Sequence, residues 1–436
     1  MATGLLAYPI FDGPWPEAGQ NQIIYRVRPS RLTGEVSISG AKNSVLRLLA
    51  ASLLSDGTLH LLNYPEGLLD AQVHVEMLRM LGKECTVANG EIVIRGPYPP
   101  SSVLNWQGRS IRNTLLILGA LTARTGEGRV PLPGGCNLGE RKYDLHEMLL
   151  RRLGAEVWEE EGFLCARASS GLIGAEIHLP LRSTGATENA ILCGVLAKGV
   201  TRVWNPHIRP EIIDLIRCLR GMGARIQVFG QEHIEITGVE GLVGTRYSIL
   251  PDNMEALTWL VAAVVTGGAV EIHNFPYDDL EVPLIHLRES GARMFRGDDS
   301  MIVRGSRCYP LEISTGPYPG INSDMQPLLA VYAAFARGQS VIVDLRFPGR
   351  YGYAEELAKM GLQYETGDNL LRINGGSPLR GATVRALDLR AGIALTLAGL
   401  GAAEGETVIH DAWQVERGYN RFVEKVKSLG GDIGYA

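Results

Sequence analysis

The chain has 436 residues, of which 45% are hydrophobic and 20% charged, with a formal net charge of −5. This length exceeds what one core usually serves, so two domains of roughly 200 residues each are expected. The slight acidity disfavours a dedicated nucleic-acid-binding protein, which normally carries a basic excess. No apolar run approaches the ~18–20 residues of a membrane helix, so we expect no membrane partner.

The N-terminal segment, residues 1–20, lacks a basic start and contains several prolines. We expect a flexible extension rather than a signal peptide. The six cysteines are scattered and form no CxxC pair, which disfavours both a disulfide framework and a structural metal site. A reducing, cytoplasmic location is therefore expected.

A repeat extends along the chain from the first predicted helices to the last. Amphipathic helices end in a residue pair whose second member is glycine, at Leu81-Gly82, Leu153-Gly154, Met222-Gly223, Ser290-Gly291, Met360-Gly361 and Leu429-Gly430. Glycine is the expected terminator because it enters the left-handed region freely. Upstream of each amphipathic helix lie a helix rich in small residues, a turn and a short apolar strand. The pattern predicts six helix–strand–helix–strand units of about 70 residues, three in each of two α/β domains.

Lys42 is the first polar feature that breaks this pattern. It stands in SGAKN, between a predicted strand and a predicted helix. A lysine at a helix N-terminus opposes the helix dipole, so it is poorly placed for stability. It either forms an anion site with free backbone N–H groups or is an exposed lysine in a turn.

Cys136 stands in a segment with three glycines and a proline, close to Arg141. This composition predicts a loop rather than a core position. A cysteine near an arginine there can have a lowered pKa and act as an acid or a nucleophile. The alternative is a surface thiol without a role, because most single cysteines are packing residues.

Asp324 and several arginines open predicted apolar helices. Asp324 either caps its helix or acts as a base, which requires a hydroxyl within hydrogen-bond reach. Arg390 leads into an almost wholly apolar helix, where an unpaired guanidinium is expensive. Such an arginine needs a carboxylate or a phosphate partner, and an internal acidic partner remains the equal alternative.

Together these segments resemble the enolpyruvyl transferases, and within them the UDP-N-acetylglucosamine branch, from about Arg26 to the C-terminus. The resemblance is carried by ISGAKN (38–43), PGGCNLGERKYDLH (133–146), STGATEN (183–189), RPEIIDL (209–215), SDMQ (323–326), DLRAG (388–392) and ERGYNR (416–421). The sister branch that makes enolpyruvylshikimate phosphate lacks the cysteine loop. The resemblance implies two inside-out α/β domains, each of three βαβα-type pseudo-repeats. One comprises 21–42 plus 248–436 and the other 43–247.

The resemblance also implies a reaction and its residues. The enolpyruvyl group of phosphoenolpyruvate would move to a hydroxyl of a uridine nucleotide with release of phosphate, and with no metal or organic cofactor. Cys136 would supply a proton to the methylene carbon and Asp324 would act as the base. Lys42, Arg141 and Arg390 would hold the phosphate and carboxylate. Asn43 and Arg112 would line the same cleft.

The acceptor side of the resemblance shows departures. Arg346 stands at a normally aliphatic position near the sugar, and Tyr318 replaces a histidine. The predicted acceptor residues are Arg141, Lys142, Tyr143, Asp144 and Leu145 near uracil, Arg182, Ser183, Thr184 and Gly185 near the diphosphate, and Arg346 and Arg350. Three hypotheses stay open: UDP-N-acetylglucosamine as acceptor in peptidoglycan precursor synthesis, a smaller uridine nucleotide such as UMP in nucleoside-antibiotic synthesis, or a non-catalytic binding relative.

Overall fold

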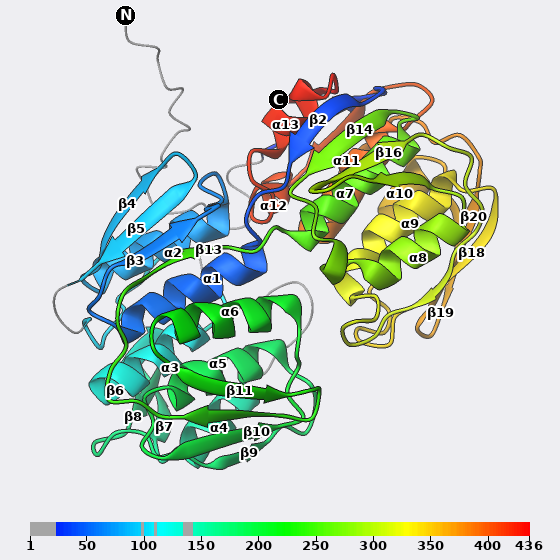
Figure 1. Cartoon of the computed structure of the whole chain (residues 1–436). Helices are drawn as coiled ribbons and strands as arrows, with labels where there is room; N and C mark the ends of the chain where they lie inside the picture. The colour runs from blue at the N-terminus through cyan, green and yellow to red at the C-terminus, as the bar shows by residue number, and fades with distance from the viewer. Residues whose placement is uncertain (1–22, 97–99, 109–110, 134–142) are drawn as a thin grey trace, which may run out of the picture.

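The computed structural model describes residues 23–96, 100–108, 111–133 and 143–436, which form two lobes (Figure 1). One hydrophobic cluster draws its buried residues from 25–38 and 254–433, and a second draws them from 45–249. We call the first the discontinuous lobe and the second the continuous lobe. The domain boundaries near residues 42 and 248 stay a prediction, which this division of the core supports.

The described strands form six small sheets, three in each lobe. In the continuous lobe the orders are β13-β3-β5-β4, β6-β8-β7 and β11-β12-β10-β9; in the discontinuous lobe they are β21-β22-β1-β23, β15-β16-β14-β2 and β17-β18-β20-β19. The strands of the continuous lobe are β3 (Leu59–Leu62), β4 (Glu84–Ala88), β5 (Glu91–Arg95), β6 (Glu127–Pro131), β7 (Glu156–Glu160), β8 (Phe163–Arg167), β9 (Glu176–His178), β10 (Val200–Trp204), β11 (Arg225–Phe229), β12 (His233–Thr237) and β13 (Thr245–Ser248). Those of the discontinuous lobe are β1 (Tyr25–Arg28), β2 (Thr33–Ser37), β14 (Ala269–His273), β15 (Arg293–Arg296), β16 (Ser300–Arg304), β17 (Glu312–Ser314), β18 (Gly338–Val343), β19 (Gln363–Gly367), β20 (Leu370–Gly375), β21 (Thr383–Arg385), β22 (Thr407–His410) and β23 (Asp432–Tyr435).

The helices rich in small residues lie inside each lobe, where they pack against one another. They are α1 (Lys42–Ala51), α3 (Thr114–Thr125) and α5 (Thr184–Gly194) in the continuous lobe, and α7 (Asn253–Val265), α9 (Gln326–Phe335) and α11 (Leu389–Leu400) in the discontinuous lobe. Small residues allow this close approach: a Cβ on Gly119 of α3 would lie 1.8 Å from Asn189 Oδ1 of α5. The remaining helices are α2 (Leu69–Met80), α4 (Asp144–Arg152), α6 (Pro210–Gly221), α8 (Glu281–Glu289), α10 (Gly352–Lys359), α12 (Trp413–Glu416) and α13 (Phe422–Ser428).

The predicted α/β class and the three units per domain are confirmed in the part of the chain that the structure describes. The six terminator glycines all have positive φ, between 83° at Gly430 and 103° at Gly361, as the repeat predicts. One correction concerns the unit itself. Its second strand is followed by a third that returns as a hairpin, as in β4–β5 and β7–β8. None of the described helices combines the length and apolar character that a membrane crossing requires.

The chain crosses between the lobes after β2 and crosses back after β13. β2 pairs in parallel with β14, whereas β13 pairs in parallel with β3. The two crossing segments are hydrogen-bonded to each other: Ala41 N donates to Leu250 O over 2.8 Å, and Asp252 N donates to Ser39 O over 2.9 Å. This pairing places the N-termini of α1 and α7 together between the lobes, where Lys42 N donates to Asp252 Oδ2 over 3.1 Å.

Candidate active site

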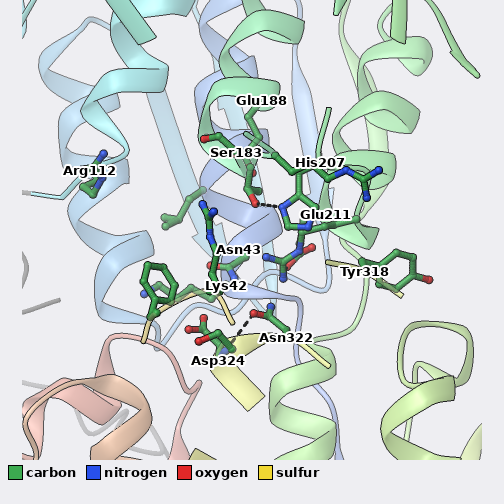
Figure 2. A pocket seen from close by; sticks show the side chains of 18 of the residues that line it. Lys42, Asn43, Arg112, Ser183, Glu188, His207, Glu211, Tyr318, Asn322 and Asp324 are labelled. Atoms are coloured by element: carbon green, nitrogen blue, oxygen red, sulfur yellow. Dashed lines mark hydrogen bonds and ion pairs between the residues drawn. The ribbon is translucent and has the colours of Figure 1, made fainter. Parts of the chain in front are cut away.

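A cleft of about 1080 Å³ is lined by side chains of both lobes (Figure 2). Figure 2 shows Lys42 and Asn43, at the start of α1, close to Asp324 and Asn322 of the discontinuous lobe. His207, Ser183 and Glu211 of the continuous lobe also line the cleft. Cationic and anionic side chains therefore meet in a space that opens between the two cores.

Lys42 is held at the cleft by a buried carboxylate. Its Nζ lies 2.9 Å from Asp70 Oδ2, on α2. Burial lowers the pKa of Lys42, and the Asp70 carboxylate opposes that shift. Asp70 also accepts from Arg417, whose Nε lies 3.2 Å from Asp70 Oδ1. Because Arg417 follows α12 in the discontinuous lobe, this carboxylate joins cations of both lobes.

Asp324 lies in a short 3-10 helix, η3 (Ser323–Met325), and is held by two guanidinium groups. Arg350 Nη1 lies 2.9 Å from Asp324 Oδ1, and Arg390 Nη2 lies 3.7 Å from Oδ2. Burial alone would raise the pKa of Asp324, but Arg350 and Arg390 outweigh it and hold the pKa well below its ordinary value. The carboxylate is therefore ionised and able to accept a proton.

The alternative that Asp324 caps α9 is wrong. Asn322 Oδ1 accepts from Asp324 N over 3.1 Å, so the amide side chain makes the turn. The carboxylate of Asp324 is left for the two arginines. Asp324 is therefore not a helix cap, and its role as a base stays a prediction.

Arg390 and Arg350 lie behind Asp324 rather than on the cleft wall. The Arg390 side chain is 5% exposed, and its Nη1 donates to Tyr419 Oη over 3.2 Å. Burial lowers the pKa of Arg390, whereas Tyr419 and the carboxylates of Asp324 and Asp252 raise it more strongly. Both arginines are thus fixed guanidinium groups that orient the Asp324 carboxylate.

The wall of the continuous lobe is formed around the N-terminus of α5. Ser183 caps this helix by accepting from Ala186 N over 3.3 Å. Thr184 Oγ1 lies 2.9 Å from His207 Nδ1. Arg182 Nε donates to Asn205 Oδ1 over 3.3 Å. These contacts link the segment before α5 to the loop between β10 and α6.

The predicted site residues separate into three groups. Those that line the cleft are Lys42, Asn43, Arg112, Asp144, Leu145, Arg182, Ser183, Thr184, Gly185, Asp324 and Arg346. Cys136, Arg141 and Lys142 lie outside the described residues. Arg350, Arg390 and Tyr143 lie off the wall. For Tyr143 this departs from the predicted contact with uracil, because its hydroxyl hydrogen-bonds Glu159 on β7.

Several charged residues of the cleft were not predicted. Arg47 Nε lies 2.6 Å from Glu188 Oε1, and Arg209 Nη2 lies 3.0 Å from Glu211 Oε1. Glu188 and Glu211 are almost completely buried, in α5 and α6. Both glutamates could have been identified from the sequence. Each is a charged residue among apolar or small residues, in a helix that the repeat places inside or against a core, and a buried charge of this kind needs a partner.

Trp413 also lines the cleft. It begins α12, the short helix between β22 and Arg417. The guanidinium of Arg417 lies 5.9 Å from the Trp413 ring centroid. The indole therefore packs beside one of the cations that Asp70 holds.

Comparisons with known proteins show the family to which the chain belongs. The family model described as EPSP synthase (3-phosphoshikimate 1-carboxyvinyltransferase) matches residues 27–426. UDP-N-acetylglucosamine 1-carboxyvinyltransferase 2 of Carboxydothermus hydrogenoformans is 40% identical over 407 residues, 92% of this chain and 96% of that protein. The corresponding enzyme of Zymomonas mobilis is 40% identical over 413 residues, with the same coverage of 92% and 96%.

Solved structures show the same similarity. The enolpyruvyl transferase NikO from Streptomyces tendae has a TM-score of 0.86 and 26% identity, covering 95% of this chain and 99% of NikO. An EPSP synthase from Acinetobacter baumannii has a TM-score of 0.76 and 22% identity, covering 95% of this chain and 100% of that one, which shows the shared fold. The predicted resemblance and the fold class are thereby confirmed. The chain belongs to the enolpyruvyl (1-carboxyvinyl) transferase family.

Proposed function

We propose that this protein transfers the enolpyruvyl group of phosphoenolpyruvate to a hydroxyl of UDP-N-acetylglucosamine, a step of peptidoglycan precursor synthesis. The observation that carries the proposal is the juxtaposition in one cleft of the Lys42 and Asp324 side chains, from different lobes. Relatives that cover 92% of the chain at 40% identity carry the name of this transferase. The choice of UDP-N-acetylglucosamine as the acceptor rests on this sequence similarity.

The cations around Asp70 are suited to bind phosphoenolpyruvate. Lys42 and Arg417 both contact the Asp70 carboxylate, and both line the cleft. A small dianion that enters here finds an ammonium and a guanidinium group already fixed in place. Preorganised charge of this kind stabilises the charge that develops on a departing phosphate. Arg112, which also lines the cleft, adds a third cation.

The proposed chemistry is an addition followed by an elimination. In the addition, the acceptor oxygen bonds to C2 of phosphoenolpyruvate, its proton passes to Asp324, and C3 gains a proton from the Cys136 thiol. In the elimination, C3 returns a proton to the Cys136 thiolate, the bond from C2 to the phosphate oxygen breaks, and phosphate leaves with the proton that Asp324 took up. Asp324 is ionised at the outset, so it begins in the form that accepts a proton.

A smaller uridine nucleotide such as UMP is the second candidate acceptor. The similarity to NikO, an enolpyruvyl transferase with a TM-score of 0.86 and 26% identity, supports it. The Arg346 side chain also lines the cleft, at the position predicted near the sugar. A non-catalytic role is disfavoured because Lys42 and Asp324 face the same cleft.

Phosphate release distinguishes these candidates. The protein is incubated with phosphoenolpyruvate and UDP-N-acetylglucosamine, UMP or no nucleotide. Phosphate release with UDP-N-acetylglucosamine supports the main proposal. Release with UMP but not with UDP-N-acetylglucosamine supports UMP as the acceptor instead. No release with either nucleotide contradicts both. Release without a nucleotide shows hydrolysis rather than transfer.

A further inference from the structure

The turn 417–421, between α12 and α13, joins the two lobes beside the cleft. Arg417 contacts Asp70 through two nitrogens, with Nε 3.2 Å from Oδ1 and Nη2 3.4 Å from Oδ2. Asn420, three residues later, accepts a hydrogen bond at Oδ1 from Gly67 N over 2.9 Å. Gly67 and Asp70 both belong to the continuous lobe and are also three residues apart. The two contacts therefore link the same two segments.

A second hydrogen bond fixes the Asn420 side chain. Its Nδ2 donates to Ser39 Oγ over 3.0 Å, in the segment through which the chain crosses between the lobes. Lys425 Nζ donates to the same Oγ over 2.8 Å, and Glu255 Oε2 accepts from Ser39 N over 2.9 Å. Because Ser39 is itself held in this way, Asn420 cannot rotate away from Gly67 without losing both of its hydrogen bonds.

The turn lies so close to Gly67 that it leaves no room for a side chain there. A Cβ at position 67 would lie 2.8 Å from Asn420 Oδ1 and 3.1 Å from Arg421 Cγ. Both distances are shorter than ordinary van der Waals contact between such atoms. Glycine therefore permits this close approach of the two lobes.

Arg421 adds a third contact between the lobes, and it is weaker. Its Nη2 lies 3.4 Å from Glu66 Oε1, but the Arg421 side chain is 45% exposed, and exposed ion pairs contribute little. The backbone of Arg421 has a φ of 51°, which residues other than glycine rarely adopt, so the chain bends sharply into α13. The contact of Asn420 with Gly67, rather than the ion pair, therefore sets the distance between the two segments.

We infer that Asn420 is a positioning residue for the cations that we propose to bind phosphoenolpyruvate. By fixing the turn against Gly67, it holds the Arg417 guanidinium at Asp70, beside Lys42. Neither Asn420 nor Gly67 lines the cleft, so Asn420 acts through Arg417 and does not touch the substrate. The inference rests on the proposed function. If this contact is lost, Arg417 is less fixed, and a dianion must order the guanidinium group as it binds, which costs affinity.

Calorimetric titration with phosphoenolpyruvate tests this positioning role. Asn420→Ala should bind the ligand about three- to tenfold more weakly than the wild type, because the hydrogen bonds that fix the turn are lost. Asn420→Asp should restore most of the affinity, since a carboxylate oxygen can still accept from Gly67 N and the Ser39 hydroxyl can donate to the other oxygen. In steady-state phosphate release, Asn420→Ala should raise the KM for phosphoenolpyruvate by the same factor and leave kcat within about twofold.

Gly67→Ala tests the same contact from the continuous lobe. The added methyl group should push the turn away and weaken phosphoenolpyruvate binding as Asn420→Ala does. In the double variant the two losses should not add, because the shorter side chain at position 420 frees the space that the methyl group needs. Asn374→Ala, which removes an amide that accepts from Gln339 Nε2 over 3.0 Å, is the matched control and should bind as the wild type does.

Several outcomes would overturn the inference. They are phosphoenolpyruvate affinity equal to that of the wild type in Asn420→Ala and Gly67→Ala, additive losses in the double variant, and a loss that Asn420→Asp shares in full. Wild-type protein that does not bind phosphoenolpyruvate overturns both the inference and the proposed function. Phosphoenolpyruvate binding that responds to the variants as expected, without transfer to either nucleotide, contradicts the proposed function alone.

Discussion

Asp70 of the continuous lobe and Arg417 of the discontinuous lobe form an ion pair across the cleft, with Asp70 Oδ1 3.2 Å from Arg417 Nε. The same carboxylate accepts from Lys42 Nζ over 2.9 Å. Asp70 is 3% exposed, so solvent does little to weaken these contacts. One buried carboxylate thus sets the positions of two cations that we propose to bind phosphoenolpyruvate.

Replacing Asp70 by asparagine should destabilise the protein and strengthen its response to phosphoenolpyruvate. The variant removes the buried carboxylate that Lys42 and Arg417 share, at a cost of about 3 kcal/mol. Thermal denaturation should show a Tm several degrees lower than that of the wild type. Added phosphoenolpyruvate should raise the Tm of the variant more, because the ligand supplies the missing negative charge.

Asp56→Asn is the control for this experiment. Asp56 pairs with Arg124 over 2.5 Å, but its side chain is 41% exposed, so its loss should cost less than about 1 kcal/mol. If Asp70→Asn and Asp56→Asn melt alike, with equal shifts on adding phosphoenolpyruvate, Asp70 does not hold the cations as described.

Asp324→Asn should lower kcat by about 10²–10⁴-fold while phosphoenolpyruvate affinity changes little. The amide keeps the size of the side chain but cannot accept the hydroxyl proton. Steady-state phosphate release gives kcat, and titration gives the affinity. Asp298→Asn, at an exposed position, should match the wild type. A fully active Asp324→Asn variant would exclude the base role.

The acid limb of the pH profile gives a second check on Asp324. Because Arg350 and Arg390 hold its pKa well below the ordinary value, the carboxylate stays ionised throughout mildly acidic conditions. A fall in kcat between about pH 7 and pH 5 must then come from another group. If that fall disappears in the residual activity of an Asp324→Asn variant, Asp324 titrates in this range and the described ion pairs are wrong.

Fosfomycin should modify one cysteine, Cys136. Fosfomycin is an epoxide, and an epoxide reacts with the thiolate form of cysteine. The other cysteines form little thiolate or are not accessible to the reagent. Burial raises the pKa of Cys85 to about 11 and that of Cys218 to about 12, and Cys165, Cys193 and Cys308 are buried. Intact-protein mass spectrometry should show a single adduct, and Cys136→Ser should show none and lose most turnover. Adducts that persist in Cys136→Ser would contradict this assignment.

Asp279→Asn should stabilise the protein at neutral pH and not in acid. Burial raises the pKa of Asp279 to about 6, with the carboxylates of Glu211, Asp278 and Asp214 adding to the shift and Arg217 opposing it. The folded protein therefore binds this proton more tightly than the unfolded chain, and stability is lost as pH rises through about 6. The variant should have the higher Tm at about pH 7 and an equal Tm at about pH 4. A lower Tm at neutral pH would contradict the shift.

The repeat could be predicted from the sequence because a glycine marks the end of each helix. Gly361 and Gly430 have φ of 103° and 83°, which other residues rarely adopt, so each helix end is marked by glycine. The third strand of each unit carried no comparable signal. In β4–β5, for example, most side chains of β4 are exposed, so the apolar alternation that identifies a strand is weak.

The site was predictable where a charge stands at the start of an apolar helix. Lys42 and Asp324 both do, and both line the cleft. The choice of partners was not predictable, because it depends on tertiary structure. Asp70 and Arg417 are 347 positions apart, and Tyr143 turns to Glu159 on a neighbouring strand rather than to the cleft.

Transfer to a hydroxyl is tested by the mass of the acceptor after reaction with phosphoenolpyruvate. A uridine nucleotide should gain one carboxyvinyl group for each phosphate released, and Asp324→Asn should make almost none of this product. Phosphate released while the nucleotide stays unmodified and pyruvate accumulates would contradict transfer to a hydroxyl in this cleft.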